Sequence, residues 1–300
     1  MKKHQIIATE PHGHRLMVFI IFALLFVLII VGWRLYLNYH KTTEAPTNWQ
    51  FISCDVGQGD MSLIKTDDHS AIAIDAGPDP QSAQSCLTWA GITTITHVFI
   101  THDHLDHRGG LEAICHQCTV ITSDYSSSKI STRLSTAQFV QAQEGMTYQL
   151  SDNTTITVIS APQHTQSVPG DSESSQENNS SLVLNATFIA PANFNVLLTG
   201  DIEEGRINQL LPQLNLPRTD ILKIPHHGSK YSGTALETRL KPAVGVISAG
   251  KNNSYGHPNQ EIIDALQQTN THIFETETTG HIAFVAATEG NQLEITTQKT

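Results

Sequence analysis

One short segment of the sequence concentrates side chains that bind metals. Thr101-His-Asp-His-Leu-Asp-His107 follows an apolar stretch and holds three histidines and two aspartates within six residues. In an extended or looped backbone alternate side chains point to one side, so His102 and His104 can reach one metal ion together. Asp106 and His107 can then serve a neighbouring ion. Zinc, manganese or iron suits such ligands, and their density argues against a merely solvated loop.

Two metals need more ligands than one loop supplies, and a carboxylate shared between the metals is common in two-metal hydrolytic sites. Leu197-Leu-Thr-Gly-Asp201 offers one, because an apolar strand ends there and places Asp201 at its tip. Gly-Asp alone is a common turn, so this prediction depends on the His loop. We expect Asp201 to bridge the two metals.

Late histidines complete the candidate set. Ile224-Pro-His-His-Gly-Ser229 puts two of them at the end of an apolar strand, where adjacent side chains diverge. One of His226 and His227 could then bind metal while the other hydrogen-bonds a substrate oxygen or protonates the leaving group. His257 alone would be an ordinary loop residue. The predicted catalytic residues are Asp106, His226 and His227.

Short apolar segments separated by turn residues must position these motifs. Strands are predicted at 51–54, 61–64, 71–74, 97–100, 155–159, 181–188, 195–198, 220–224 and 243–248. Helices are predicted at 109–115, 130–143, 203–211, 234–240 and 260–268, with no convincing helix before the His loop. Two series of strands with helices between them predict an α/β sandwich. The polar residues 170–180 are expected to form a flexible surface loop.

An uncharged apolar run from Leu16 to Trp33 is close to the roughly 20 residues that cross a bilayer. A cleaved signal peptide usually has an apolar region of about 7–15 residues that ends in small residues, whereas this run continues into bulky side chains. Basic residues on its two sides only weakly favour an extracytoplasmic catalytic domain. The predicted parts are a tail at 1–15, a single-pass anchor at 16–37, a tether at 38–48 and one hydrolase domain at 49–300.

The net charge and the cysteines restrict the classes of partner and of cellular compartment. The net charge is −11 with only 17 basic residues, so a polyanionic substrate must be held mainly by the metals and local donors. The four cysteines suit an oxidising compartment without requiring one. Cys115-His-Gln-Cys118 resembles half of a zinc site, but no second pair completes it. A short disulfide or two buried thiols are the favoured alternatives.

Further motifs extend the pattern along the chain. They are Cys54-Asp-Val-Gly-Gln-Gly-Asp60, Ile74-Asp-Ala-Gly77, Asn178-Asn-Ser-Ser-Leu-Val-Leu184 and Tyr255-Gly-His-Pro258. With the His loop, Thr199-Gly-Asp201 and Pro225-His-His-Gly-Ser229, they occur in the order seen in ComEC-type competence proteins. Residues 48–300 therefore resemble the C-terminal metallo-β-lactamase-like domain of that family.

This resemblance implies an αββα sandwich with a dinuclear site between its two sheets. The ligands carried over are His102, His104, Asp106, His107 and Asp201. By analogy with the wider superfamily His257 would be the late histidine ligand, with His226 and His227 near the scissile phosphate. The resemblance leaves the reverse assignment open.

One departure concerns a histidine that the wider superfamily has ahead of its Gly-Asp strand. Asn178 and Asn179 stand there, and because Asn is a poor zinc ligand one metal would be weakly held. His164 is a possible substitute, with a plain loop histidine as the alternative.

Three further aspartates are expected to support the site. Asp55, Asp60 and Asp75 flank glycine turns, where a carboxylate can orient a ligand histidine through its other ring nitrogen.

The sequence thus predicts a membrane-anchored hydrolase with two divalent metals, zinc or manganese, that activate water and stabilise the developing oxyanion. The resemblance favours phosphodiesters, single-stranded DNA among them, over β-lactams. One alternative is a phosphorylcholine esterase-like enzyme acting on small or surface phosphoesters. Another is a non-catalytic accessory domain in DNA uptake, which the intact His loop disfavours. A chain with one predicted span is not itself a translocation pore.

Overall fold

The computed structural model describes residues 12–41, 44–131, 137–164, 172–214, 218–287 and 292–299. The chain divides into two compact units, Met1–Thr43 and Glu44–Thr300. The division falls inside the predicted tether, which is shorter than expected because helix continues to Lys41 and Ala45 already donates its N–H to Trp89 O at 2.8 Å.

The first unit contains one helix, α1 (His12–Lys41). Its segment Met17–Arg34 has a mean hydropathy of 2.7 and none of its side chains is buried. Length and composition make it a candidate membrane span, although a signal sequence would meet the same criteria.

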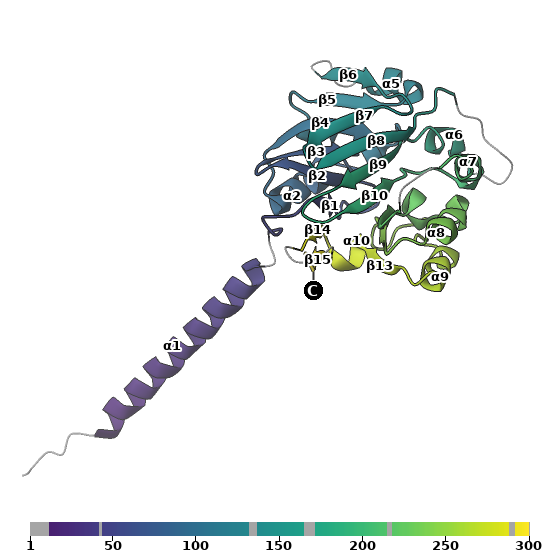
Figure 1. Ribbon diagram of the computed structural model, residues 1–300. Helices are drawn as coiled ribbons and strands as arrows, with labels where there is room; N and C mark the ends of the chain where they lie inside the picture. Colours follow the sequence, from purple (N-terminus) through teal and green to yellow (C-terminus); the bar gives the residue numbers. More distant parts are fainter. Residues whose placement is uncertain are drawn as a thin grey trace, which may run out of the picture. The chain divides into compact units, whose positions relative to one another are not determined.

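The second unit contains two mixed sheets (Figure 1). The described strands of the first sheet run in the order β15 (Leu293–Thr297), β14 (Ile282–Ala286), β1 (Phe51–Ser53), β2 (Ser62–Asp67), β3 (Ser70–Ile74), β4 (Thr94–Ile100), β5 (Thr119–Thr122) and β6 (Gln138–Gln141). Those of the second run β13 (His272–Glu275), β12 (Val244–Ile247), β11 (Ile221–Lys223), β10 (Phe194–Leu198), β9 (Val183–Phe188), β8 (Thr154–Ser160) and β7 (Thr147–Ser151). Strands β3 to β6 are parallel to one another, and so are β10 to β13.

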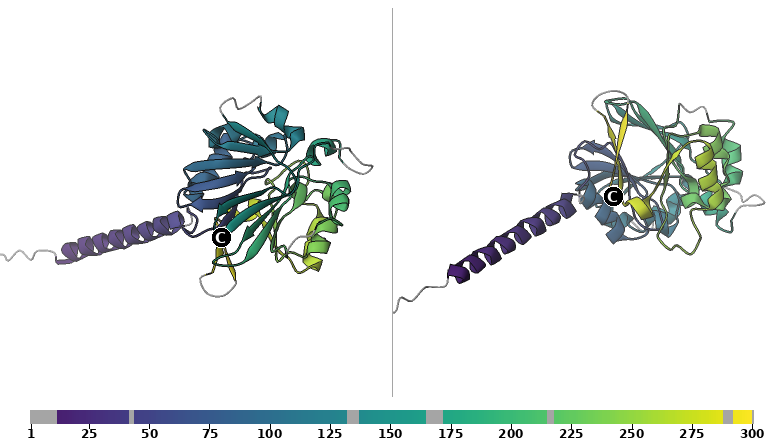
Figure 2. Two further views of the ribbon diagram at one scale, coloured as in Figure 1. Left: turned by 45° about the horizontal axis from the view of Figure 1, so that its top comes forward. Right: turned by 90° about the horizontal axis from the view of Figure 1, so that it is seen from below.

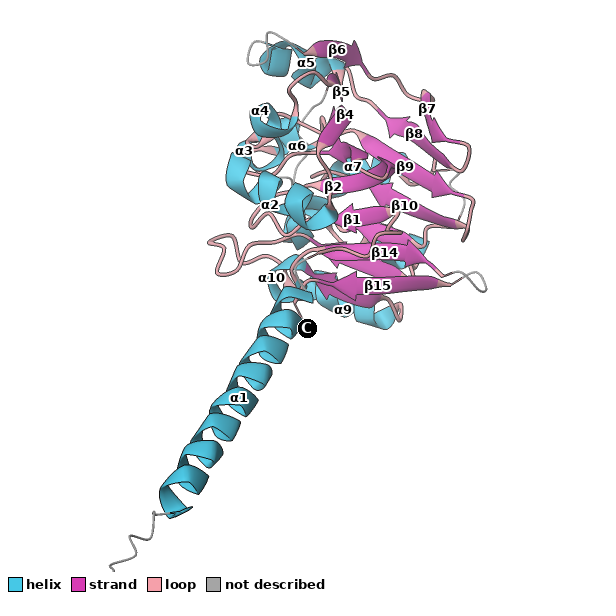
Figure 3. Ribbon diagram, turned by 90° about the vertical axis from the view of Figure 1, so that its left-hand side faces the viewer, coloured by secondary structure: helices cyan, strands magenta, loops and turns pink. Residues whose placement is uncertain are grey.

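Helices cover the outer face of each sheet. α2 (Pro80–Ala90), α3 (Leu105–Arg108) and α4 (Leu111–Ile114) lie against the first sheet (Figure 3). α7 (Glu204–Leu210), α8 (Ala235–Leu240) and α9 (Gln260–Gln268) flank the second sheet (Figure 2). The remaining elements are α5 (Asp124–Ser131), α6 (Ser175–Asn178), α10 (Thr276–Thr279) and the 3-10 turns η1 (Pro225–Gly228) and η2 (Lys230–Ser232).

Three apolar clusters hold these layers together. Successive strand residues point to opposite faces, so Ile52 and Leu63 pack with the helices of the first sheet while Phe51 and Ile64 pack against the second sheet. A third cluster joins the second sheet to α7, α8 and α9. The predicted αββα sandwich is confirmed.

Several expected elements were wrong. A helix, α2, does precede the His loop: Asp79 accepts from Gln81 N and Ser82 N, and Gly91 ends the helix with φ 71°. The predicted helix at 130–143 is replaced by the end of α5 and strand β6, because Phe139 packs against the core beside β5. The described part of the predicted loop 170–180 is not a flexible surface loop, because α6 lies there and Asn178 is buried.

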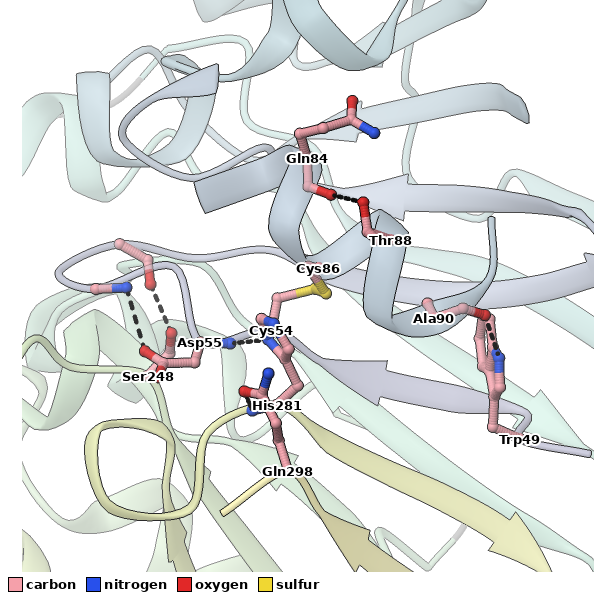
Figure 4. Close-up of a disulfide and its surroundings, with 12 residues drawn as sticks. Trp49, Cys54, Asp55, Gln84, Cys86, Thr88, Ala90, Ser248, His281 and Gln298 are labelled. Carbon is pink, nitrogen blue, oxygen red and sulfur yellow. Dashed lines mark hydrogen bonds between the residues drawn. A yellow bond between two sulfur atoms is a disulfide. The ribbon is translucent and has the colours of Figure 1, made fainter. Parts of the chain in front are cut away.

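Both cysteine pairs form disulfides, Cys54–Cys86 and Cys115–Cys118. The second confirms the short-disulfide alternative and removes the half zinc site. The first joins the end of β1 to α2 beside His281, whose Nδ1 accepts the N–H of Asp55 at 2.9 Å (Figure 4). It therefore fixes the start of the turn that leads to Asp60.

Candidate metal centre

The predicted site residues follow the carboxyl ends of strands from both sheets. The His loop follows β4, Asp201 follows β10, the His226-His227 pair follows β11, and His257 lies in the loop after β12. Parallel strands bring their carboxyl ends to one edge of a sheet, where sites commonly form. Here they border a cavity of about 560 Å³.

Four side chains bring their ligand atoms together within 4.8 Å of one another. This ligand cluster consists of Asp106, His107, Asp201 and His227. Asp201 Oδ2 lies 3.2 Å from Nε2 of both His107 and His227. Asp106 Oδ2 lies 3.3 Å from His227 Nε2 and 4.0 Å from His107 Nε2. Ligands of one tetrahedral zinc ion are separated by about 3.3 Å, so the cluster has the dimensions of a metal site.

Hydrogen bonds on the far side of each ring set the tautomers in the ligand cluster. His107 Nδ1 lies 2.8 Å from Asp75 Oδ2, and His227 Nδ1 lies 2.8 Å from Ser248 O. Both acceptors need a proton on Nδ1, so in the neutral ring that binds a metal the lone pair is on Nε2 and faces the cluster. Among the described residues those Nε2 atoms and Asp201 Oδ1 are buried without a hydrogen-bond partner, as ligand atoms for a cation would be.

His102 and His104 face each other next to this cluster. His102 Nε2 lies 3.0 Å from His104 Nδ1 and 4.0 Å from Asp201 Oδ2. Two imidazole nitrogens this close can share one metal, with Asp201 as the group common to both positions. Ser181 Oγ lies 3.2 Å from His102 Nδ1 and accepts the N–H of Asp201 at 3.1 Å.

The two asparagines at the position of the expected histidine both hydrogen-bond Glu203, while Asn178 also lines the cavity and its Oδ1 is buried without a partner among the described residues. Asn178 Nδ2 donates to Glu203 Oε1 at 2.7 Å, and Asn179 Oδ1 accepts the N–H of Glu203 at 2.9 Å. Ser172 donates to the same carboxylate from both its N–H and its hydroxyl. His164 is exposed and does not line the cavity. His164 therefore does not lie where it could replace the missing histidine.

The late histidines separate into two kinds. His226 and His227 both adopt positive φ, 51° and 56°, which turns their side chains apart. His227 joins the ligand cluster, whereas His226 lines the cavity with its Nε2 3.9 Å from Asp201 Oδ2. His257 also lines the cavity, with its ring centroid 6.3 Å from that of His227. The geometry thus groups His227, and not His257, with the second set of ligands.

Of the three aspartates expected to support the site, two do so. Asp75 holds His107 as predicted and accepts the N–H of Thr101 at 2.7 Å. Asp60 lies 3.3 Å from His227 Nδ1 and 2.8 Å from the ammonium of Lys223. Asp55 was wrongly expected here, because it pairs with Lys299 at 2.8 Å.

Sequence reasoning missed Lys223, Ser248 and Glu203. Each is buried and becomes recognisable only through a partner distant in the chain. Lys223, immediately before the turn that carries the paired histidines, was the one with a visible signal, since it is a charge within an apolar strand.

The electrostatics favour a cation. Burial raises the pKa of Asp201, but His107 and His227 beside it bring that pKa well below its usual range. Burial lowers the pKa of His107, yet Asp201 and Asp75 bring it well above its usual range. Without a metal the histidines compensate the carboxylates by holding protons. The residues present therefore fit a divalent cation.

The comparisons with known proteins agree with this geometry. Residues 71–217 match the family described as the beta-lactamase superfamily domain. The domain that contains these residues is a metallo-β-lactamase superfamily domain. Within the superfamily it is ComEC-like: it is 30% identical over 203 residues to ComE operon protein 3 of Bacillus subtilis (strain 168), covering 66% of this chain and 25% of that protein. It is 26% identical over 255 residues to recombination protein 2 of Haemophilus influenzae, covering 81% of this chain and 29% of that protein.

The aligned part of the chain thus spans between 25% and 29% of the length of these relatives. The matched family region contains the His loop and Asp201 but ends before His226, so the roles of the late histidines depend on geometry.

Solved structures share the fold. Igni18, a metallo hydrolase from Ignicoccus hospitalis, has a TM-score of 0.54 at 14% identity and covers 78% of this chain and 99% of its own. Zn(2+)-bound PqqB from Methylobacterium extorquens has a TM-score of 0.50 at 10% identity and covers 73% of this chain and 85% of its own. These likenesses show the metallo-β-lactamase fold. Together with the family match and the ligand cluster, they support a metal-dependent hydrolase-like domain.

Proposed function

We propose that this chain is a membrane-anchored phosphodiesterase that uses two divalent cations, zinc or manganese. The observation that carries the proposal is the ligand cluster, whose buried and unpartnered atoms have the spacing of a metal site. We assign His102 and His104 to the first ion, Asp106, His107 and His227 to the second, and Asp201 to both. His257, expected as a ligand, is reassigned to the cavity wall.

The other residues of the site orient the ligand histidines or face the substrate. When bound, the cations supply a water that loses its proton near neutral pH and neutralise charge on the phosphate oxygens. Asp75 and Ser248 keep the proton of His107 and His227 on Nδ1. His226 Nε2 and the ring of His257 face the cavity, where they can hydrogen-bond phosphate oxygens and the leaving group.

A relative of the chain and the net charge of the chain both bear on the class of substrate. The name of the Haemophilus relative connects that protein with recombination, which favours phosphodiesters of nucleic acids, including single-stranded DNA, over β-lactams. With 17 basic residues against 28 acidic ones, the chain is poorly suited to holding a long duplex by its phosphates alone.

We infer an extracytoplasmic location for the hydrolase domain. Two disulfides are typical of proteins in oxidising compartments. The apolar helix α1 supplies the single membrane anchor.

The test uses the full chain in detergent, stripped of metal and reloaded with Mn²⁺ or Zn²⁺. Hydrolysis of bis(p-nitrophenyl) phosphate and of a single-stranded oligonucleotide, but not of nitrocefin, is expected. Asp106→Asn should lose activity and one of the two bound ions. The control is Asp68→Asn, because the side chain of Asp68 is 91% exposed, and this variant should keep its activity and both ions. Metal-loaded protein that cleaves no phosphodiester would leave the accessory-domain alternative.

A further inference from the structure

Two large apolar side chains stand exposed at the cavity that contains the proposed metal site. Tyr255 is 71% exposed and Leu105 is 62% exposed, and both line the cavity. In the described part of Glu44–Thr300 only two other large apolar side chains are exposed, Ile189 at 57% and Val140 at 38%. Exposed apolar groups concentrated at a cavity mark a binding surface.

The backbone of the loop that carries Tyr255 is held in place by the side chain of Asn253. The amide of Asn253 donates to Gly250 O at 2.9 Å and to His257 O at 2.7 Å, and its carbonyl accepts the N–H of His257 at 3.0 Å. Tyr255 therefore sits inside a closed hydrogen-bonded loop. Because the backbone is fixed and the ring lies beside that of His257, less conformational entropy is lost when a ligand packs on Tyr255.

Tyr255 belongs to a row of nearly parallel rings that leads to the ligand cluster. Its ring lies 5.6 Å from that of His257 with 25° between their planes. The ring of His257 lies 6.3 Å from that of His227 with 23° between them. The row of rings thus connects an exposed aromatic face at the cavity to the ligand cluster in two steps, through His257.

The excess of acidic residues indicates how a nucleic-acid strand would be bound. With 17 basic residues against 28 acidic ones, contacts to phosphates away from the metals contribute little attraction. Stacking of bases on aromatic rings is the other general source of affinity for single strands, and it tolerates any base. A base must be unpaired to stack on a protein ring, so this surface selects single strands.

We propose that Tyr255, backed by His257 and with Leu105 on the same cavity rim, forms a stacking subsite for the unpaired nucleobase next to the scissile phosphodiester. The proposal rests on the proposed phosphodiesterase function and deepens it. The subsite gives the site a nucleotide preference that metals alone would not give.

Three esters with the same p-nitrophenol leaving group test the subsite in the metal-loaded full chain. They carry thymidine, choline or methyl as the second group on the phosphate. We expect the thymidine ester to have the highest kcat/KM. In Tyr255→Ala the ratio of kcat/KM for the thymidine ester to that for the methyl ester should fall about tenfold through KM, and Tyr255→Phe should preserve the ratio. Ile189→Ala, which removes an exposed apolar side chain away from the cavity, is the control.

Preference for the choline ester, or a Tyr255→Ala ratio equal to that of the parent, would overturn the subsite while the phosphodiesterase stands. Failure of the parent on all three esters would overturn the phosphodiesterase, and a metal-free binding assay then decides the subsite separately. With EDTA present, fluorescence anisotropy should show the full chain binding oligo(dT) about tenfold more tightly than an abasic strand of equal length. Tyr255→Ala should abolish that difference, and equal binding of both strands by the parent would refute the subsite.

Discussion

Asp75 Oδ2 lies 2.8 Å from Nδ1 of His107, while the opposite nitrogen of the same ring lies 3.2 Å from Asp201 Oδ2. Asp75 also accepts from the N–H and hydroxyl of Thr101, the first residue of the His loop. One buried carboxylate thus fixes both the loop and the orientation of a proposed ligand.

Asp75→Asn should weaken metal binding without unfolding the protein. The amide is uncharged and has one accepting oxygen, so it cannot accept from both the N–H of Thr101 and Nδ1 of His107 as the two carboxylate oxygens do. Loss of such support typically lowers metal affinity about 10–100-fold. Titration of the metal-stripped full chain with Mn²⁺ or Zn²⁺ measures the change, and circular dichroism checks the fold. Unchanged affinity in a folded variant would show that Asp75 is purely structural.

Removal of His227 and removal of His257 should have different effects on metal binding. His227→Ala should lose one bound ion per chain, because His227 Nε2 lies 3.2 Å from Asp201 Oδ2. His257→Ala should retain the metal and lose activity, since His257 lines the cavity outside the ligand cluster. Metal analysis of both variants distinguishes the two assignments, and metal loss confined to His257→Ala would restore the assignment made from the sequence.

The Cys54–Cys86 disulfide should contribute more stability than Cys115–Cys118. It joins residues 32 apart in sequence against 3 apart, and a longer closed loop restricts the unfolded chain more. Replacing the first pair by alanine should lower the free energy of unfolding by about 3–4 kcal/mol and the second by about 2 kcal/mol. Urea unfolding of the two double variants compares them, and equal losses would contradict this explanation.

Glu237 on α8 should make stability depend on pH. The side chain is fully buried, neither carboxylate oxygen has a hydrogen-bond partner on another described residue, and burial raises its pKa to about 7 from 4.5. Because the folded pKa exceeds the unfolded one, its contribution is fully favourable below pH 4.5 and is lost as pH rises toward about 7.

Glu237→Gln should remove this dependence and be more stable than the parent at pH 8, by up to about 3 kcal/mol. Thermal unfolding of both proteins at pH 5 and pH 8 measures it. If the difference in stability between the parent and the variant is the same at pH 5 and pH 8, Glu237 does not titrate as a buried group.

The His loop and Asp201 could be predicted because each directly follows an apolar strand, so local sequence reports both the strand and the ligand. The choice between His227 and His257 could not, since it depends on the positive φ of His226 and His227. The role of Glu203 was also hidden, because its partners Asn178 and Ser172 lie 25 and 31 residues away. Helix α2 was missed although its Asp79 cap and terminal Gly91 were visible, because small buried residues such as Ala83 weaken its apolar pattern.

The most direct test of the proposed function is the rate at which the metal-stripped full chain hydrolyses bis(p-nitrophenyl) phosphate as Mn²⁺ or Zn²⁺ is added. We predict that the rate rises from background, saturates at two ions per chain and returns to background with a chelator, while Asp201→Asn stays at background throughout. A rate that does not depend on added metal, or an Asp201→Asn variant as active as the parent, would contradict a shared two-metal site.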